Sequence, residues 1–243
     1  MSKKAINQNT NYDSELLNSI DSNFVFNENP INRLRNTADN VKKDNTFDQI
    51  DKEKELNELK LQINSINDCN LKDNSKKIVL GDGNINSPIM LVGEAPGAEE
   101  DSVGKAFLGE VGDLLKKMLN AINIKKEDIY TTYAVNFRPP EDRKPTPIEI
   151  KRYSQFLQKQ ISIIKPKIII LMGSTAMESL TGLKNKISKE RGKWKEIIIK
   201  NTNYNVIITF NPSYLLRVPE NKKYSWEDLK KIKQKIADLK LNI

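Results

Sequence analysis

The hydrophobic residues follow two alternating patterns from about residue 76 onward. Short, nearly continuous apolar runs predict strands at 77–80, 89–92, 128–135, 167–172, 193–199 and 205–210. Between them, apolar residues spaced three and four apart predict helices at 111–122, 146–164, 173–180 and 225–240. Strands that alternate with helices are typical of a parallel sheet covered on both faces. The predicted fold class is therefore α/β, a three-layer α/β/α sandwich with a central, mostly parallel sheet.

Two of the predicted helices begin at recognisable capping residues. Thr146 can cap the helix at 146–164, Pro147 suits its first position, and Glu149 completes a capping box. Ser174 is the expected cap of the helix that follows the strand at 167–172. The last helix gathers its apolar residues on one face, which we expect to be the inner face: Trp226, Leu229, Ile232, Ile236 and Leu239.

The first 60 residues differ from the rest because they are rich in Asn, Asp and Lys and poor in large apolar residues. Such a composition buries too little apolar surface to fold, so we expect residues 1–50 to be mostly disordered, with a short helix near 14–20. Residues 52–66 have a helical pattern, and one face carries Leu56, Leu59, Ile63 and Ile66. We therefore divide the chain into a flexible extension at 1–60 and one domain at 61–243.

Charge and composition narrow the classes of function. The chain has 243 residues and a net charge of +8, and acidic residues outnumber basic ones in 1–75, so the remainder is strongly basic. A basic domain favours a polyanionic partner, nucleic acid before membrane, although a lysine-rich surface alone would give the same balance. The sequence has no histidine, which excludes histidine metal sites, Ser-His-Asp triads and imidazole bases.

The single cysteine and the lack of long apolar runs bear on the cellular compartment of the protein. One cysteine, Cys69, excludes a disulfide within a monomer and favours a reducing compartment. No apolar run approaches the roughly 20 residues of a membrane span, and the first residues lack the apolar segment of a signal peptide. We therefore expect a cytoplasmic monomer with access to the nucleoid and no membrane partner.

Three loops that follow predicted strands carry the most unusual residues. They are GEAPG at 93–97, RPPEDRKPTP at 138–147 and NPSYLLR at 211–217. In a parallel sheet, loops after the carboxyl ends of the strands meet at one crevice. We therefore expect these three loops to converge on one site.

These loops resemble those of a known family of DNA repair enzymes. Residues 93–119, GEAPGAEEDSVGKAFLGEVGDLLKKML, are similar to the first motif of the family 4 uracil-DNA glycosylases. FRPPEDRKPTPIEI, KIIILMGSTA, RGKW and NPSYLLR follow in that family's order, so the resemblance covers about residues 66–240. It implies the uracil-DNA glycosylase fold, base excision repair, and hydrolysis of the N-glycosidic bond of uracil or a related damaged base in DNA, which leaves an abasic site. Since no lysine stands in a motif as a Schiff-base candidate, we expect a monofunctional enzyme.

The first motif would supply the carboxylate and the base pocket. Cleavage of a glycosidic bond develops positive charge on the sugar and negative charge on the base, so it requires a carboxylate, hydrogen-bond donors and a slot for the flipped base. The resemblance gives the carboxylate to Glu94 and the stacking platform to Phe107. The plain alternatives are a solvated loop acid and a core aromatic. The resemblance also implies a base-binding role for Gly93, Ala95, Gly97 and Tyr133.

The last motif would supply a donor and a wedge. Asn211 stands where family 4 usually has a histidine, and its amide can still donate to the base oxygen. Leu216 and Arg217, with Leu215, would enter the duplex as the base leaves, although a buried helical turn suits Leu215 nearly as well. The other implied DNA contacts are Ser213, Arg138 and Arg191, with an ion pair as the alternative for Arg191. Further basic residues that could follow phosphates are Arg143, Lys144 and Lys193.

Two departures from the family pattern concern the base reader and the metal. The family reads the base edge with an asparagine where this chain has Tyr133, and a phenol cannot supply the paired donor and acceptor of an amide. The four cysteines of the family's four-iron, four-sulfur cluster correspond here to Ile66, Cys69, Phe137 and Tyr153. We therefore predict no metal and no cofactor, with Cys69 as an inert buried thiol.

These departures leave alternative functions open. The first is a catalytically weakened or inactive DNA-binding member of the same superfamily. The second is a glycosylase for another damaged base. A protein that binds small nucleotides is disfavoured because the chain lacks a phosphate-loop motif.

Overall fold

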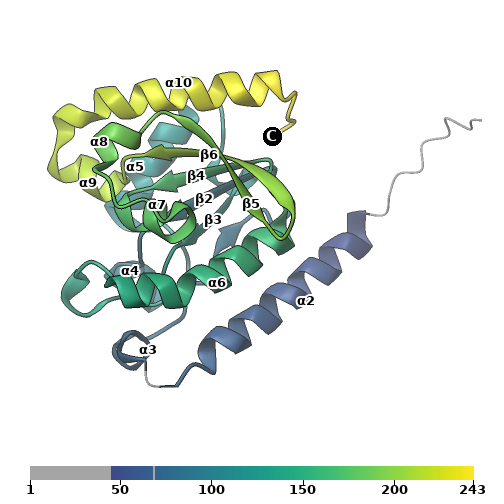
Figure 1. Ribbon diagram of the computed structural model, residues 1–243, viewed down its shortest axis with the longest axis vertical. Coiled ribbons are helices and arrows are strands. Elements are labelled where there is room, and N and C mark those ends of the chain that lie inside the picture. The colour runs from purple at the N-terminus through teal and green to yellow at the C-terminus, as the bar shows by residue number, and fades with distance from the viewer. Residues whose placement is uncertain (1–44, 68) are drawn as a thin grey trace, which may run out of the picture. The chain divides into compact units, whose positions relative to one another are not determined.

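A computed structural model describes residues 45–67 and 69–243 (Figure 1). The disorder expected for residues 1–44 and the helix expected near 14–20 lie outside the described residues, whereas 45–50 are helical. The helices are α2 (Asn45–Asn64), α3 (Asn70–Asn74), α4 (Ala98–Val103), α5 (Gly109–Asn120), α6 (Pro147–Ile164), α7 (Ser174–Thr181), α8 (Ile187–Glu190), α9 (Pro212–Arg217) and α10 (Lys222–Asp238). The strands are β1 (Asp82–Gly83), β2 (Ile89–Gly93), β3 (Tyr130–Tyr133), β4 (Ile168–Met172), β5 (Trp194–Ile199) and β6 (Thr202–Thr209).

The strands form one six-stranded sheet in the order β1-β3-β2-β4-β6-β5. The inner strands β3, β2, β4 and β6 are parallel, whereas β1 and β5 are antiparallel to their neighbours at the two edges. Because the inner strands run the same way, their carboxyl ends lie at one end of the sheet. The predicted α/β class and the mostly parallel sheet are confirmed.

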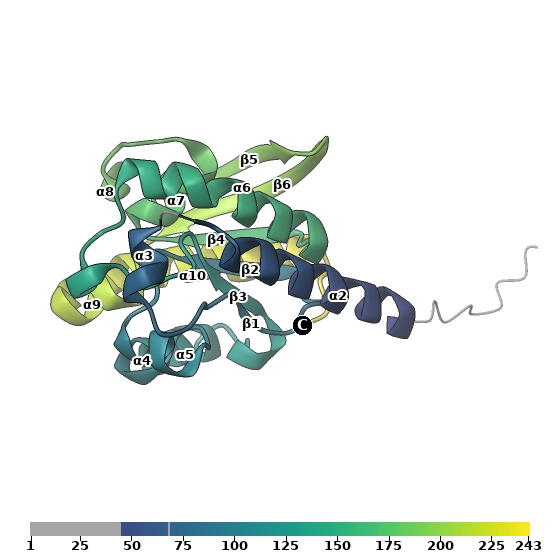
Figure 2. The same cartoon turned by 90° about the horizontal axis from the view of Figure 1, so that it is seen from below.

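Alternate residues of the inner strands pack into two cores, one on each face of the sheet. In β2, Met90 and Val92 belong to one buried cluster, whereas Ile89 and Leu91 belong to the other. The first cluster includes apolar residues of α2, α6 and α7, and the second includes apolar residues of α5 and α10. Figures 1 and 2 show these helices on the two sides of the sheet. This arrangement explains why β2 and β4 are continuous apolar runs: both of their faces are covered.

Most predicted elements are confirmed, but the strand expected at 77–80 is wrong. That segment is not part of the sheet, and the strand at this edge is β1, two residues farther along. The backbone N–H of Val79 donates to the Asn136 carbonyl (2.9 Å), and the Asn136 amide donates to the Val79 carbonyl (3.0 Å). These two hydrogen bonds satisfy the backbone of Val79, and the Leu80 carbonyl accepts from the Thr132 hydroxyl and the Gln160 amide in place of a ladder.

The capping predictions are confirmed at α6 and wrong at α7. At α6, Thr146 accepts from the Glu149 N–H, and Glu149 accepts from the Thr146 N–H at 2.7 Å. At α7 the cap residue is Gly173, so Ser174 is the first helical residue and its hydroxyl is directed elsewhere. The inner face predicted for α10 holds for Leu229 and Ile232, which are buried, but Trp226 and Leu239 are exposed.

The boundary predicted between 60 and 61 falls inside α2. Leu56, Leu59 and Ile63 of this helix are buried in the same cluster as apolar residues of α6. The compact unit that contains the sheet begins at Asp44. The helix therefore packs as part of the folded domain, although most of it lies within the predicted extension.

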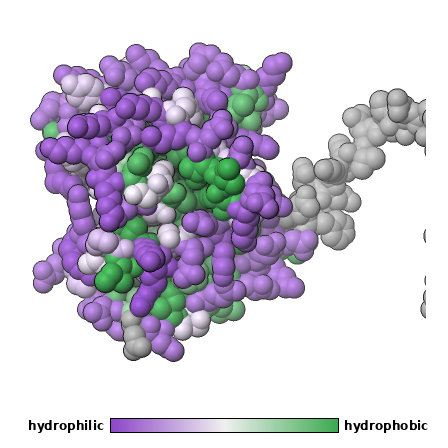
Figure 3. Space-filling view, viewed as in Figure 1, coloured by the Kyte–Doolittle hydropathy of each residue, from purple (hydrophilic) through white to green (hydrophobic). Residues whose placement is uncertain are grey.

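The described surface is largely polar. Figure 3 shows hydrophilic residues over most of one face, around a smaller hydrophobic area near its centre. Among the described residues, none of the helices combines the length and apolar character needed to cross a membrane.

Candidate active site

Glu94 directly follows β2, and its carboxylate is held by three hydrogen-bond donors. Oε1 accepts from the Ser174 hydroxyl at 3.1 Å and from the Thr175 backbone N–H at 3.0 Å, while Oε2 accepts from the Asn211 amide at 3.2 Å. Ser174 and Thr175 begin α7 after β4, and Asn211 follows β6. The carboxyl ends of three adjacent parallel strands therefore meet at one half-buried acid, as the strand-end rule predicts.

The turn between β4 and α7 can approach Glu94 because residue 173 is a glycine. Gly173 has φ of +105°, and a β-carbon there would lie 2.8 Å from Oε1 of Glu94. Any side chain at this position would displace the carboxylate and strain the backbone. The glycine of KIIILMGSTA therefore makes room for the acid of GEAPG.

The Asn211 amide is oriented by hydrogen bonds at both ends. Its Oδ1 accepts from the backbone N–H of Ser213 at 3.0 Å, which caps α9, and its Nδ2 donates to Glu94. The side chain is buried, 7% exposed. The structure thus brings the two predicted catalytic residues, Glu94 and Asn211, into direct contact.

Phe107 and Tyr133 stack on each other close to Glu94. Their ring centroids lie 4.8 Å apart at an interplanar angle of 26°, and the two residues are 2% and 3% exposed. Both rings close over Gly93, where a β-carbon would lie 2.7 Å from Phe107 Cζ and 2.7 Å from Tyr133 Cδ1. Gly93 therefore serves the packing of the ring pair, and Phe107 is both a core aromatic and a cavity wall.

A buried acid, Glu100, anchors this ring pair. Tyr133 accepts from the Phe107 N–H (3.0 Å) and donates to Glu100 Oε1 (3.3 Å), which also accepts from the Leu108 N–H (3.0 Å). Glu100 Oε2 accepts from the Gly97 N–H at 3.1 Å. Burial, and next the negative charge of Glu100, raises the pKa of Tyr133 well above its ordinary value. The phenol is therefore neutral and keeps its proton for Glu100.

The loop that carries Phe107 is held in an unusual conformation. Phe107 has φ of +54°, which is uncommon for a bulky residue and indicates local strain. The Lys126 ammonium binds the carbonyls of Ala106 and Phe107 at 2.7 and 2.8 Å. Gly112 makes room for the same Phe107 carbonyl in the first turns of α5. These contacts keep the ring in place against Tyr133.

Most of the predicted site residues line one cavity of about 270 Å³, whereas Gly93, Arg138, Arg191 and Leu216 are outside its lining. Its lining includes Glu94, Ala95, Gly97, Phe107, Tyr133, Asn211, Ser213 and Arg217. This volume lies just below the range for drug-sized ligand sites, roughly 300–1,000 Å³, so the cavity suits a small ligand. A wider groove of about 750 Å³ shares Glu94, Lys144, Asn211 and Arg217 with the cavity and continues past Tyr214 and Tyr224.

Comparison with known proteins agrees with this geometry. The sequence profile of the Uracil DNA glycosylase superfamily matches residues 80–233. The chain belongs to the uracil-DNA glycosylase superfamily. A Type-4 uracil-DNA glycosylase of Thermotoga maritima is 40% identical over 168 residues, which cover 68% of this chain and 86% of that protein.

Two further relatives are a second glycosylase and a DNA polymerase. A Type-4 uracil-DNA glycosylase of Archaeoglobus fulgidus is 34% identical over 181 residues, or 73% of this chain and 91% of that protein. A DNA polymerase of Bacillus phage SP01 is 38% identical over 128 residues, which are 52% of this chain and 14% of that protein. The resemblance drawn from the motifs is confirmed at the level of the superfamily and of its type-4 members.

The basic residues expected on the DNA side of this uracil-DNA glycosylase superfamily member differ in their surroundings. Arg217 is exposed and lines both the cavity and the groove, next to exposed Leu216 on α9. Leu215 is fully buried, so the helical-turn alternative holds for it. Arg138 is outside the cavity lining, but it is paired at 2.7 Å with Asp142, which lines the cavity.

Arg191 forms the ion pair that was its alternative. Its guanidinium contacts both carboxylate oxygens of Asp228, at 2.7 and 3.0 Å, and also donates to the Tyr224 carbonyl. Asp228 is fully buried and accepts from the Thr209 hydroxyl at 2.8 Å. Arg191 still borders the groove, but its charge is largely used inside the domain.

The positions that correspond to cluster cysteines do not fit an iron–sulfur cluster. Ile66, Cys69, Phe137 and Tyr153 belong to one apolar cluster, in which Phe137 and Tyr153 meet edge to face at 6.2 Å. Cys69 Sγ lies 3.2 Å from the Tyr153 hydroxyl. An iron–sulfur cluster of this type needs four thiolates, and the sequence contains one cysteine. We therefore assign no chemical step to such a group.

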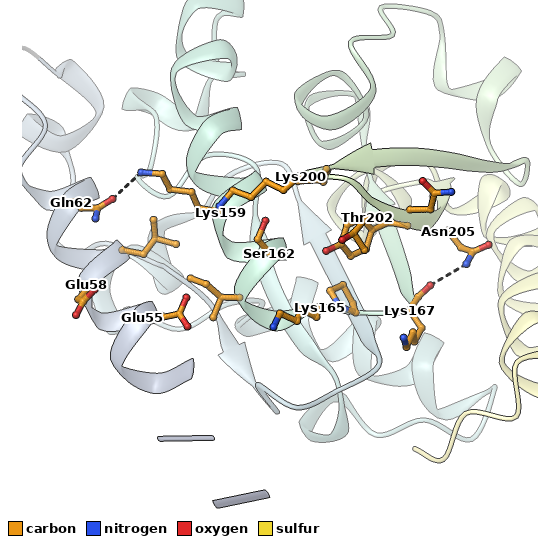
Figure 4. Close-up of a pocket in the computed structure, with 16 residues that line it drawn as sticks. Glu55, Glu58, Gln62, Lys159, Ser162, Lys165, Lys167, Lys200, Thr202 and Asn205 are labelled. Atoms are coloured by element: carbon orange, nitrogen blue, oxygen red, sulfur yellow. Dashed lines mark hydrogen bonds between the residues drawn. The ribbon is translucent and has the colours of Figure 1, made fainter. Parts of the chain in front are cut away.

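A separate groove of about 660 Å³ lies at the opposite end of the sheet (Figure 4). Its lining includes Lys167, just before β4, and Thr202 and Asn205 of β6, so it lies at the amino ends of the parallel strands. Side chains from α2 and α6 complete it, among them Glu55, Glu58 and Lys159. It contains none of the predicted site residues and is distinct from the site at Glu94.

Sequence reasoning missed three residues that shape the site: Glu100, Ser174 and Thr175. Glu100 stands three residues after Gly97, the spacing of a capping box, which was a usable signal for a structural acid. Ser174 was predicted only as a helix cap, and Thr175 acts through its backbone. The sequence carries no local signal that either would contact Glu94.

Proposed function

We propose that this protein hydrolyses the N-glycosidic bond of uracil, or of a related damaged base, in DNA and leaves an abasic site. One observation carries the proposal: the Glu94 carboxylate, held by three donors, stands at a cavity of about 270 Å³ whose wall includes the Phe107 and Tyr133 rings. The names of the relatives from T. maritima and A. fulgidus support the same reaction.

Glu94 would stabilise the sugar and orient the attacking water. As the bond to the base lengthens, positive charge grows on the deoxyribose, and a nearby carboxylate lowers the energy of that state. Oε1 accepts from both Ser174 and Thr175, whereas Oε2 accepts only from Asn211 among the described residues, so Oε2 would be the oxygen that orients the water. The water would give its hydroxyl to the sugar and its proton to the departing base.

Asn211 would stabilise the departing base. The Nδ2 group has two hydrogens, and one hydrogen bond to Glu94 leaves the second for the base oxygen. The bond from the Ser213 N–H fixes which end of the amide faces the cavity. A preorganised donor of this kind is typically worth a factor of about 10²–10³ in rate.

DNA would lie along the groove next to the cavity. Leu216 is exposed at the end of α9, where an apolar side chain can fill the gap left by a flipped base. The phosphate backbone of the DNA would be contacted by Arg217, Lys144 and the half-buried Ser213. Arg138 and Arg191 would contribute less to DNA binding because each is paired with an acid. We propose that the protein acts as a cytoplasmic monomer.

We further propose that the protein functions without an iron–sulfur cluster. The single cysteine and the packed aromatic residues at the matching positions support this. The purified protein should be colourless and contain no stoichiometric iron, whereas a brown sample with broad absorption in the visible blue would refute it.

The decisive experiment compares uracil release by the wild type with release by Glu94→Gln and Glu94→Ala. Substrates are single- and double-stranded oligonucleotides, and Glu196→Gln, an exposed acid on β5, is the matched control. The Glu94 variants should lose about 10²–10⁴-fold in rate while they retain DNA binding, and the control should match the wild type. DNA binding without release of any base from a panel of deaminated and alkylated substrates would instead identify an inactive DNA-binding member.

A further inference from the structure

The Phe107 ring already has an aromatic neighbour before any base arrives. Tyr133 stacks on it at 4.8 Å, and only 2% of Phe107 is exposed. A flipped base gains affinity by stacking on the face of such a ring. In this chain, one face of the platform is covered by the chain's own side chain.

Tyr133 is fixed in that place by its hydroxyl and by Gly93. The hydroxyl has one hydrogen, which goes to Glu100 Oε1, and its oxygen accepts from the Phe107 N–H. Gly93 lies directly beneath both rings, so they pack against strand β2 without a gap. The donor that could contact a base is therefore already used, and Glu100 in turn accepts from Leu108 and Gly97.

These contacts bear on how the cavity selects a base. An asparagine at position 133 would offer a donor and an acceptor to the base edge and would leave the Phe107 face open. Tyr133 offers neither a free donor nor an open platform, yet it still lines the cavity. A tyrosine in place of an asparagine at position 133 therefore alters both the recognition of the base edge and the stacking surface.

We propose that Tyr133 is a specificity-determining residue, whose ring holds the stacking place on Phe107 and whose hydroxyl reads no base edge. This inference rests on the proposed function. Its consequence is a cavity that accepts a flipped base by size and holds uracil only weakly. Replacing Tyr133 by asparagine should convert the site into one that binds uracil more tightly.

The test measures binding, so that it does not depend on turnover. Wild type, Tyr133→Asn and Tyr133→Phe are titrated with a duplex that contains 2′-fluoro-arabinouridine opposite guanine, which resists hydrolysis, and with the matched C·G duplex. Tyr133→Asn should raise the preference for the uracil duplex by about 5- to 150-fold, the range expected for one base stacked on an aromatic ring. Tyr133→Phe keeps the ring in the stacking place, so any gain it shows should stay below the roughly fivefold lower limit of a stacking gain.

A second variant covers the case in which a buried asparagine unfolds the domain. Tyr133→Leu keeps apolar volume but removes the ring, and should shift the preference in the same direction as Tyr133→Asn; urea unfolding verifies that each variant is folded. No gain in a folded variant would overturn the proposal. If the variants gain affinity while no protein releases uracil from ordinary DNA, the assignment of Tyr133 stands and the proposed function fails.

Discussion

The hydrogen bond from Ser174 to Glu94 offers a sharp test of how the site is built. Ser174→Ala removes one of the three donors to the carboxylate, the hydroxyl 3.1 Å from Oε1, and leaves the Thr175 N–H and the Asn211 amide in place. Hydrogen bonds to charged groups are worth about 1.5–3 kcal/mol. Both Ser174 and Glu94 are half-buried, so water can partly replace the hydroxyl, and the lower value applies.

We therefore expect Ser174→Ala to lower kcat for uracil release by about tenfold, which corresponds to roughly 1.4 kcal/mol, with little change in KM. Ser174 acts through Glu94 and does not hold the base, so the loss belongs in the chemical step. Single-turnover rates and the concentration dependence on a uracil oligonucleotide separate the two parameters. Ser174→Thr keeps the hydroxyl and should recover most of the rate.

A matched control is Ser154→Ala, another helical serine, whose hydroxyl donates to the Lys151 carbonyl within α6. It should retain the wild-type rate. The reasoning is refuted if Ser174→Ala keeps the full kcat while Glu94→Gln loses it, because Oε1 would then need no donor from α7. A rise in KM with unchanged kcat would equally contradict a positioning role.

Three further predictions concern stability and mechanism. Arg191→Ala removes the ion-pair partner of the buried Asp228 and should lower the free energy of unfolding, measured in urea, by about 3–5 kcal/mol. The double variant Arg191→Ala, Asp228→Asn should recover part of that loss. The hydrogen bond from Arg143 holds the pKa of Glu149 below its ordinary value, so Glu149 stabilises the fold above about pH 4.5, and the stability difference from Glu149→Gln should close as pH falls below that value. Borohydride should trap no covalent DNA adduct, and an adduct that disappears in Lys144→Ala would show a lyase step instead.

Much of the fold was predictable because buried inner strands appear in the sequence as short apolar runs. Apolar runs such as 168–172 are covered on both faces, and their length and flanking turns distinguished them from helices. The run at 77–80 has the same composition, but it bonds with Asn136 and never enters the sheet. The pattern of apolar residues indicates that a segment is buried, but it does not indicate which groups form hydrogen bonds with the backbone of that segment.

The site was predictable in part for a similar reason. Glu94 and Asn211 follow strand ends, and strand order places such residues together. The roles of Ser174 and Glu100 depend on contacts between side chains from distant segments, 80 residues apart for Ser174 and Glu94. The capping-box spacing of Glu100 from Gly97 marks a structural acid, but no local pattern encodes its contact with Tyr133 or the contact of Ser174 with Glu94.

The antiparallel edge strands of the sheet determine how readily molecules aggregate at high concentration. A border strand exposes backbone groups that can recruit a strand from another molecule and start aggregation. Here β1 has only two residues, and β5 carries charged Lys195 and Glu196 beside the exposed Ile198. The apolar runs most prone to self-association lie between these borders, which protects a lysine-rich repair protein from precipitating through its own core strands.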